Sequence, residues 1–317
     1  KNMQNENVIA SISKRGNGEI YLGVVGAVRT GKSTFIKRFM EIFVLPYMED
    51  QDKKARAMDE LPQAAQGTLV MTTEPKFIPQ EAAEIEVEKG CSLKVRLVDC
   101  VGFMVDGASG HMDGASSRMV RTPWFQEEIP FSEAAEYGTN KVIQEHATVG
   151  IVVTTDGSFG DIPRENFVEA EIKTIHEIEK VRKPYVIILN SMKPYSEETK
   201  QLAQQMKECY KAPVIPVNCM QLKKDDITEI LQTILLEFPV CQVNYFVPKW
   251  TQTLDLSHPI KESLIQMARQ LQMRFVKMRQ VFDWDNEKDE AWENMISNIY
   301  VTKMSPSDGS VNLKLEM

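Results

Sequence analysis

Eight residues near the start of the chain have the composition of a phosphate-binding loop. The segment Gly26 to Ser33 reads GAVRTGKS, matches the pattern G-x-x-x-x-G-K-[ST], and follows the short apolar run 20–25. The glycines let the backbone curl so that its N–H groups point at phosphate oxygens. The lysine supplies a cation for the β- and γ-phosphates, and the serine hydroxyl reaches Mg²⁺. The predicted contacts are Gly26, Arg29, Thr30, Gly31, Lys32, Ser33 and Thr34.

An aspartate and a glycine form a second element of the predicted site. Residues 97–102 read LVDCVG, so Asp99 ends an apolar run and Gly102 follows three residues later. This spacing is similar to the D-x-x-G pattern of GTPase-like P-loop proteins. In that pattern the aspartate holds Mg²⁺ through a water and the glycine amide lies near the γ-phosphate. The alternative interpretation is an aspartate that merely caps a loop.

Two threonines lie between these motifs, in the segment MTTEPKF at 71–77. GTPase-like proteins place a threonine in this interval, where it senses Mg²⁺ and the γ-phosphate. Thr73 is the first candidate and Thr72 the second, while a simple pair of strand-entry threonines is the alternative. The predicted catalytic set is therefore Lys32, Asp99, Thr72 and Thr73, and the predicted metal set is Ser33, Thr73 and Asp99.

The residues that would meet the base depart from the guanine-binding pattern N-K-x-D. The segment 190–193 reads NSMK, so Lys193 stands where the aspartate would accept hydrogen bonds from guanine. An ammonium group has no acceptor, although it can donate to adenine N1. We therefore predict ATP rather than GTP as the nucleotide, with Asn190 and Lys193 at the base. A site that does not distinguish between purines is the alternative.

No obvious side chain orients the attacking water. Ras-like proteins use a glutamine directly after D-x-x-G, whereas Phe103 occupies that position here and cannot hydrogen-bond to water. Slow hydrolysis is therefore expected. Four arginines lie where they could approach developing phosphate charge, with surface solvation as the alternative for each. They are Arg29, Arg56, Arg118 and Arg121.

Strands that alternate with helices must position these residues. The apolar runs predict strands at 20–25, 75–88, 93–98, 149–154, 185–189 and 214–217. Helical spacing is found at 33–43, 131–146, 164–181, 197–210 and 225–237. The segment 102–130 is rich in Gly, Ser, Pro and Asp and predicts a long loop. This order indicates an α/β fold with a doubly wound, mostly parallel sheet, as in P-loop NTPases of the GTPase-like kind.

The pattern changes after Pro239. Residues 258–282 predict one long amphipathic helix, which either packs on its own domain or binds a partner. The last 20 residues predict a β-hairpin that alternates up to Met317, which suggests a truncated chain. The predicted organisation is a lead segment at 1–17, a P-loop ATPase domain at 18–240 and part of a second, α+β domain at 241–317.

Composition limits the partners. The net charge is −8, whereas nucleic-acid binders usually carry a basic excess, so no nucleic-acid partner is expected. The five cysteines show no C-x-x-C spacing, which favours buried reduced thiols in a cytosolic protein. No signal peptide or 18-residue apolar stretch is present. Membrane contact would therefore be peripheral or through a partner.

Ordered blocks of sequence, beyond the phosphate loop, resemble the stage IV sporulation protein A family. The resemblance extends from about residue 20 to 248 and more weakly to 317. The blocks that carry it are VVGAVRTGKSTFIKRFM, DELPQ, MTTEPKF, RLVDCVGF, TPWF, FSEAAEYGT, KVIQEH, TTDGSFGDI and NSMKPY. Within this resemblance, Lys32 corresponds to the phosphate-loop lysine, Asp99 to the Mg²⁺ aspartate, and Thr72 and Thr73 to the threonines that sense the γ-phosphate.

The resemblance also implies a role. The family resembles translation-factor GTPases in fold but hydrolyses ATP, and it polymerises into the basement layer of the bacterial spore coat. That layer covers the forespore's outer membrane from the cytoplasm of the mother cell. We therefore expect ATP and Mg²⁺ as ligands, and other copies of the chain and further coat morphogenetic proteins as partners. Contact with the forespore membrane would be indirect. A nucleotide-dependent regulatory switch that binds an effector without polymerising is the alternative.

Overall fold

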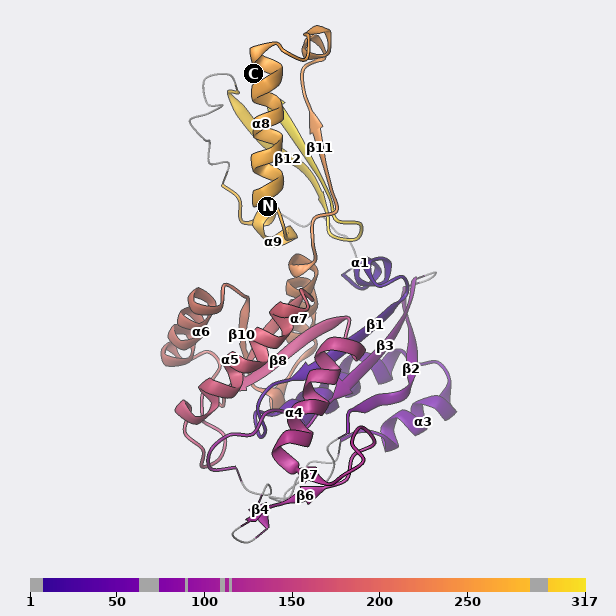
Figure 1. The fold of residues 1–317 in the computed structure, drawn as a ribbon. Helices are drawn as coiled ribbons and strands as arrows, with labels where there is room; N and C mark the ends of the chain where they lie inside the picture. Colours follow the sequence, from indigo (N-terminus) through magenta and orange to yellow (C-terminus); the bar gives the residue numbers. More distant parts are fainter. Residues whose placement is uncertain (1–7, 63–73, 89–90, 109–111, 114–115, 286–295) are drawn as a thin grey trace. The chain divides into compact units, whose positions relative to one another are not determined.

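The computed structural model describes residues 8–62, 74–88, 91–108, 112–113, 116–285 and 296–317. Two compact units are present in it, and Figure 1 shows their elements. The larger unit is Gly16–Thr233, called here the nucleotide unit. The smaller unit combines the described part of Lys1–Arg15 with Ile234–Met317 and is called the C-terminal unit. The sequence instead predicts 1–17 as a separate lead segment.

A six-stranded sheet forms the centre of the nucleotide unit, in the order β10-β9-β8-β1-β3-β2. Neighbouring strands are parallel except for β2, which runs antiparallel to β3. The strands are β1 Glu19–Val25, β2 Lys76–Glu88, β3 Cys91–Asp99, β8 Val149–Thr155, β9 Tyr185–Asn190 and β10 Val214–Val217. Every residue of β8 and β9 is buried, as expected for parallel strands covered on both faces. The predicted α/β fold with a mostly parallel sheet is confirmed.

Helices connect these strands, and Figure 1 shows α4 and α5 lying across one face of the sheet. The helices are α2 Lys32–Phe39, α3 Gln51–Asp59, α4 Phe131–Lys141, α5 Glu165–Lys180, α6 Glu197–Tyr210 and α7 Lys224–Glu237. Single π-helical turns extend α2 to Val44 and α4 to His146. The predicted loop at 102–130 contains four two-residue strands, namely β4 Met112–Asp113, β5 Ser116–Ser117, β6 Met119–Val120 and β7 Ile129–Pro130.

The C-terminal unit is built on a three-stranded sheet in the order β11-β13-β12. Its elements are α1 Val8–Arg15, β11 Gln242–Phe246, α8 Pro259–Arg274, α9 Met278–Phe282, β12 Asn298–Ser305 and β13 Ser310–Glu316. The predicted hairpin is present, because β12 and β13 pair antiparallel. Strand β11, which the sequence analysis did not predict, joins β13 in parallel. Helix α1 belongs to this unit, where Arg15 donates to the carbonyl oxygens of Pro306 at 2.6 Å and Pro239 at 2.8 Å.

The prediction of one continuous helix at 258–282 is wrong. Helix α8 ends before Phe275, whose ψ of 70° is not helical, and α9 starts only at Met278. The ring of Phe275 is buried against Trp284, with 5.3 Å between the ring centroids. The backbone of this break pairs with the segment after α7, where Val240 N donates to Val276 O and Met278 N to Phe238 O, both at 3.0 Å. Helical periodicity continues through the break because both helices bury apolar residues in one core.

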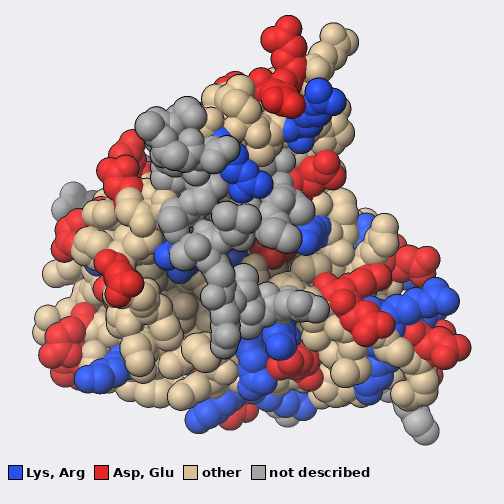
Figure 2. Space-filling model, turned by 90° about the horizontal axis from the view of Figure 1, so that it is seen from below, with Lys and Arg blue, Asp and Glu red and all other residues tan. Residues whose placement is uncertain are grey.

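Figure 2 shows acidic and basic side chains interspersed on one face rather than gathered into a field of one sign. None of the described helices is long and apolar enough to cross a membrane.

Candidate nucleotide site

The phosphate loop, residues 26–33, connects β1 to α2 and has the conformation that its glycines allow. Gly26 and Gly31 have φ values of 140° and 100°, in the region that glycine favours. A Cβ on Gly31 would lie 2.5 Å from Nδ2 of Asn190, so no larger residue fits there without a shift. The buried Thr30 hydroxyl donates to Ala27 O at 3.0 Å, and the Lys32 ammonium donates to the same oxygen. The loop is therefore closed by its own polar groups.

Ser33 and Asp99 meet at the mouth of this loop. The Ser33 hydroxyl donates to Oδ2 of Asp99 at 2.9 Å, while the buried Oδ1 has no hydrogen-bond partner among the described residues. Burial raises the pKa of Asp99, and the Lys32 charge and the Ser33 hydrogen bond oppose that shift. Burial likewise lowers the pKa of Lys32. Two of the three predicted metal residues are thus adjacent, and one carboxylate oxygen has no partner among the described residues.

This arrangement fits Mg²⁺ bound together with a nucleotide. Mg²⁺ prefers oxygen ligands and usually takes one or two from protein, with the rest from water and substrate phosphates. Within the described ranges, no group of three or more His, Cys, Asp or Glu side chains is placed to hold a metal by itself. A serine hydroxyl beside an unsatisfied carboxylate oxygen is the oxygen donor set that such a partly protein-bound ion requires. The other predicted metal residue, Thr73, lies outside the described residues together with Thr72.

Gly102 brings the D-x-x-G segment directly against the phosphate loop. Phe103 N donates to Gly26 O at 3.2 Å, and Phe103 O accepts from Val28 N at 2.9 Å. Gly102 has a φ of 96°, and a Cβ there would lie 2.2 Å from Gly26 O and 2.6 Å from the Lys32 amine. The site therefore needs glycine at this position. The Gly102 peptide lies beside the lysine that the motif assigns to the terminal phosphates.

Phe103 is a core residue. Its side chain is 3% exposed and packs in an apolar cluster with Ala27, Val28 and Phe167. The ammonium group of Lys173 lies 5.1 Å from the centre of its ring. The position that carries a water-orienting glutamine in Ras-like proteins is thus occupied by a buried aromatic ring.

The four candidate arginines are in different environments. Arg118 stacks over Phe131 at 5.1 Å, and Arg121 pairs with Glu128 at 3.1 Å. Arg56 lies exposed on α3, and Arg29 lies exposed within the phosphate loop. The φ of Arg29 is 63°, in the left-handed region, which costs a residue with a Cβ about 1 to 2 kcal/mol. Of the four, only Arg29 lies within residues 26–33, the predicted phosphate loop.

The base loop, residues 190–193, follows β9 and is tied to the phosphate loop by Asn190. Its Nδ2 donates to Thr30 O and its Oδ1 accepts from Cys219 N, both at 3.0 Å. Asn190 thus joins the C-terminal ends of β1, β9 and β10. Sequence analysis predicted this residue only as a base contact and missed its role as a connector. The sequence signal that could have drawn attention to Asn190 was the similarity of segment 190–193 to the N-K-x-D pattern.

Lys193 lies exposed beside a cavity of about 280 Å³ at the ends of β9 and β10. The lining residues are Met192, Lys193, Pro194, Tyr195, Ser196, Val217, Asn218, Gln221, Lys223 and Asp226. Asp226 is the one carboxylate in that lining, and it accepts from Lys223 N at 2.8 Å. No carboxylate therefore takes the place of the guanine-binding aspartate in the base loop.

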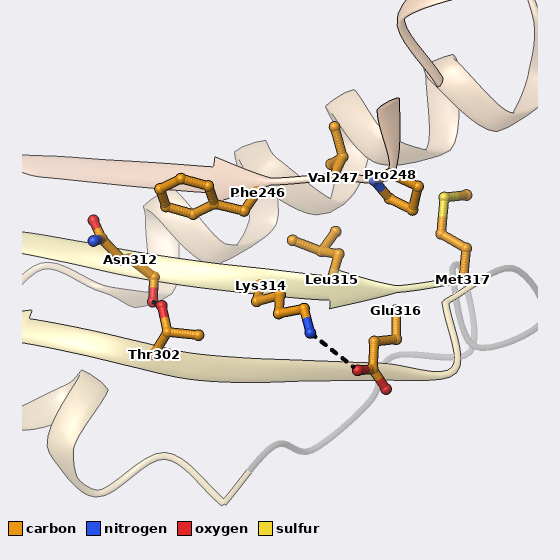
Figure 3. A pocket seen from close by; sticks show the side chains of 9 residues that line it. All are labelled: Phe246, Val247, Pro248, Thr302, Asn312, Lys314, Leu315, Glu316 and Met317. Carbon is orange, nitrogen blue, oxygen red and sulfur yellow. Dashed lines mark hydrogen bonds and ion pairs between the residues drawn. The ribbon is translucent and has the colours of Figure 1, made fainter. Parts of the chain in front are cut away.

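A larger groove of about 650 Å³ lies in the C-terminal unit, and Figure 3 shows its lining. It is bordered by β11, by the residues that follow it, and by β12 and β13, with an ion pair of 3.5 Å between Lys314 and Glu316. None of the predicted site residues lines it. The nucleotide chemistry predicted from sequence therefore gathers in the nucleotide unit.

Comparison with known proteins agrees with the assignment of this chemistry to the nucleotide unit. The family model of the stage IV sporulation protein A ATPase domain matches residues 3–239, and that of the middle domain of the same protein matches 240–317. Similar curated proteins are named stage IV sporulation protein A. They come from Bacillus anthracis (47% identity over 279 residues), Bacillus subtilis strain 168 (46% over 279) and Clostridioides difficile strain 630 (46% over 277).

These matches cover most of this chain and a smaller share of the relatives. They span 88% of the chain for both Bacillus proteins and 87% for the Clostridioides protein. The same alignments cover 57%, 57% and 56% of those relatives. The chain therefore matches little more than half the length of each relative.

Proposed function

This chain belongs to the stage IV sporulation protein A family, and from that premise we propose that its nucleotide unit binds ATP with Mg²⁺ and slowly hydrolyses the β–γ phosphoanhydride bond. The observation that carries this proposal is the convergence of Lys32, Ser33, Asp99 and Gly102 on one phosphate loop. An ATPase-domain model that matches residues 3–239 supports the same activity.

Each residue has a defined task in this proposal. Backbone N–H groups of the phosphate loop bind the phosphates, and Lys32 neutralises charge on the β- and γ-phosphates. The Gly102 N–H faces the γ-phosphate. Ser33 and Asp99 hold Mg²⁺, which when bound offsets the charge that develops on the phosphate oxygens. Thr73, with Thr72 as second choice, completes the metal and γ-phosphate contacts.

ATP is the proposed nucleotide because the base loop offers a donor in place of an acceptor. The Lys193 ammonium is exposed beside the cavity, whereas guanine N1 and N2 require acceptors. Asn190 orients the loop through its bonds to Thr30 and Cys219. Indifference to the purine is the second candidate, because Lys193 is a single long side chain with freedom to move.

For the whole protein, we propose that the ATP cycle drives self-assembly into the basement layer of the spore coat. The partners are further copies of the chain and other coat morphogenetic proteins. The assembly lies in the mother-cell cytoplasm on the forespore's outer membrane. Membrane contact is indirect, through a partner or residues outside this chain, because the net charge of −8 disfavours adhesion to anionic lipid. Family membership supports this proposal. The alternative is a regulatory switch that binds an effector without polymerising.

Phosphate release tests the enzymatic part. The purified chain should release phosphate from ATP faster than from GTP, only with Mg²⁺, and Lys32→Met should abolish release. Lys37→Met, at a half-exposed lysine of α2 that pairs with Glu41, is the matched control. Faster hydrolysis of GTP would refute the nucleotide assignment, and full activity of Lys32→Met would refute the site.

Sedimentation of the full-length protein tests the assembly part. Assemblies should pellet with ATP and Mg²⁺ and fail to form in Asp99→Asn. Unchanged pelleting of that variant, despite lost hydrolysis, would show that assembly does not depend on the ATP cycle.

A further inference from the structure

The phosphate loop contains an arginine with a left-handed backbone, Arg29. Four described residues other than glycine have positive φ, namely Asn17, Arg29, Arg182 and Lys211. Asn17, Arg182 and Lys211 each follow the end of a helix, where a left-handed residue commonly terminates the helical hydrogen bonds. Arg29 instead lies between a strand and the start of a helix. Helix termination therefore does not account for its left-handed backbone.

The neighbours of Arg29 show which part of the loop this residue presents outward. Val28 is 3% exposed and Thr30 is fully buried, whereas Arg29 is exposed. Glycine would adopt φ of 63° at no steric cost, so an arginine here indicates a use for its side chain. That side chain starts three residues before Lys32, on the same loop whose N–H groups face phosphate. A planar guanidinium can donate two parallel hydrogen bonds to the oxygens of one phosphate group.

The described site also lacks another group for the charge that develops during hydrolysis. Phe103 is buried in the core, and Arg118 and Arg121 are engaged with Phe131 and Glu128. The Lys32 ammonium is held against Ala27 O within the loop. A second cation for the γ-phosphate oxygens is therefore missing from this set, and Arg29 is the arginine exposed within the phosphate loop itself.

We propose that Arg29 is a catalytic residue that acts on the nucleotide bound by its own chain. In the transition state its guanidinium contacts the oxygens of the transferring phosphoryl group. It stabilises negative charge that is larger on these oxygens in the transition state than in the ground state. Arg29 neither transfers a proton nor forms a covalent bond in this step. This proposal rests on the ATPase function proposed above, and it assigns the charge-stabilising group of that site.

Hydrolysis by Arg29 variants provides the first test. Arg29→Ala should lower kcat by about 100-fold or more, the usual effect of removing one donor to a transition-state oxyanion, with KM within about threefold. Arg29→Lys keeps the charge but loses the planar fork, so it should recover no more than about a tenth of wild-type kcat. Arg29→Ala with kcat within twofold of wild type would overturn the proposal.

A matched pair of glycine variants separates catalysis from backbone conformation. Arg29→Gly and Arg182→Gly each remove an exposed left-handed arginine, and both should melt no lower than wild type. Only Arg29→Gly should lose hydrolysis. Equal activity of these two variants would mean that Arg29 has no part in the chemistry.

Binding of a transition-state mimic gives a readout that does not depend on turnover. Wild type should retain ADP in the presence of aluminium fluoride and Mg²⁺, whereas Arg29→Ala should bind ADP alone normally but fail to form this trapped complex. Trapping by Arg29→Ala at the wild-type level would contradict the proposed contact. If wild type itself hydrolyses no ATP, the proposed function fails; if only the Arg29 variants behave as wild type, this inference alone fails.

Mixing two inactive variants tests whether the contact is within one chain. Arg29→Ala retains Asp99, and Asp99→Asn retains Arg29, so a contact between chains would let the mixture hydrolyse ATP. We expect the mixture to be no more active than the sum of its components. Restored activity would overturn the assignment to the same chain.

Discussion

The phosphate end and the base end of the nucleotide site lie at the same edge of one sheet, yet they are built differently. At the phosphate end, Lys32 is buried, Gly102 is in close contact with Gly26, and Ser33 bonds to Asp99. At the base end, Lys193 is exposed beside an open cavity. Phosphates are common to all nucleotides and are bound largely by backbone, so that end tolerates little change.

Base identity depends on a few side chains and can change without altering the fold. Asn190 shows how the two functions are separated. It keeps its bonds to Thr30 and Cys219, which hold the loops together, while Lys193 three residues later replaces an acceptor with a donor. Asn190 therefore keeps its structural hydrogen bonds in a loop whose fourth residue departs from the guanine-binding pattern.

The largest expected effect is at the phosphate end. Asp99→Asn should reduce hydrolysis by about 100-fold or more, because a neutral amide cannot replace the carboxylate that holds Mg²⁺. The variant should not melt lower without Mg²⁺, since burial already disfavours the charged form by raising the pKa of Asp99. Phosphate release and thermal melting are the measurements. Asp225→Asn, exposed in the first turn of α7, is the control, and equal loss in both variants would contradict the assignment.

Removing the connection between the two ends should have the next largest effect. Asn190→Ala leaves the Thr30 carbonyl and the Cys219 N–H without their side-chain partner, which should lower the free energy of unfolding by about 2 to 3 kcal/mol. Urea denaturation of the chain measures this. Asn244→Ala in the C-terminal unit loses the hydrogen bonds that Asn244 donates to Asn312 and accepts from Gln242, and it should cost less because both are nearer to solvent. A loss no larger than for Asn244→Ala would mean that the ends are not coupled through Asn190.

A charge reversal at the base end should change specificity and little else. Lys193→Asp restores an acceptor for guanine, so the ratio of kcat/KM for GTP to that for ATP should rise by about tenfold. Lys193→Ala, which removes the donor without adding an acceptor, should move the ratio less. Initial rates with both nucleotides give the comparison. An unchanged ratio in Lys193→Asp would place the base elsewhere.

The smallest effect is expected in thiol reactivity. Cys219 is buried beneath Asn190, and burial raises its pKa to about 12, so its thiol is protonated at pH 8 and should resist iodoacetamide. Cys209 is exposed and should react. In Asn190→Ala, Cys219 should become modified by mass spectrometry, because its neighbouring loop is released. Wild-type Cys219 that reacts as fast as Cys209 would contradict the burial of the Cys219 thiol.

Local sequence patterns predict many of the strands and helices, because these elements depend on residues that are close together in the chain. The apolar runs at β8 and β9 and the helical spacing of α6 needed no tertiary information, since fully buried strands and amphipathic helices have direct sequence signatures. The prediction failed at the α8–α9 break. There the interruption depends on Phe275 entering a core and on backbone pairing with residues 238–240, which are distant in sequence.

The phosphate loop could be recognised from the amino-acid sequence alone, because its glycines, lysine and serine form one contiguous run in which the glycines shape the backbone and the lysine and serine contribute their side chains. It also indicated the order of strands and helices and the absence of a guanine-binding aspartate. Three contacts could be seen only in the folded chain: Ser33 with Asp99, Gly102 against Gly26, and Asn190 with Thr30 and Cys219. These contacts join strand ends separated by 29 to 160 positions in the chain, and only the register of the parallel sheet brings them together.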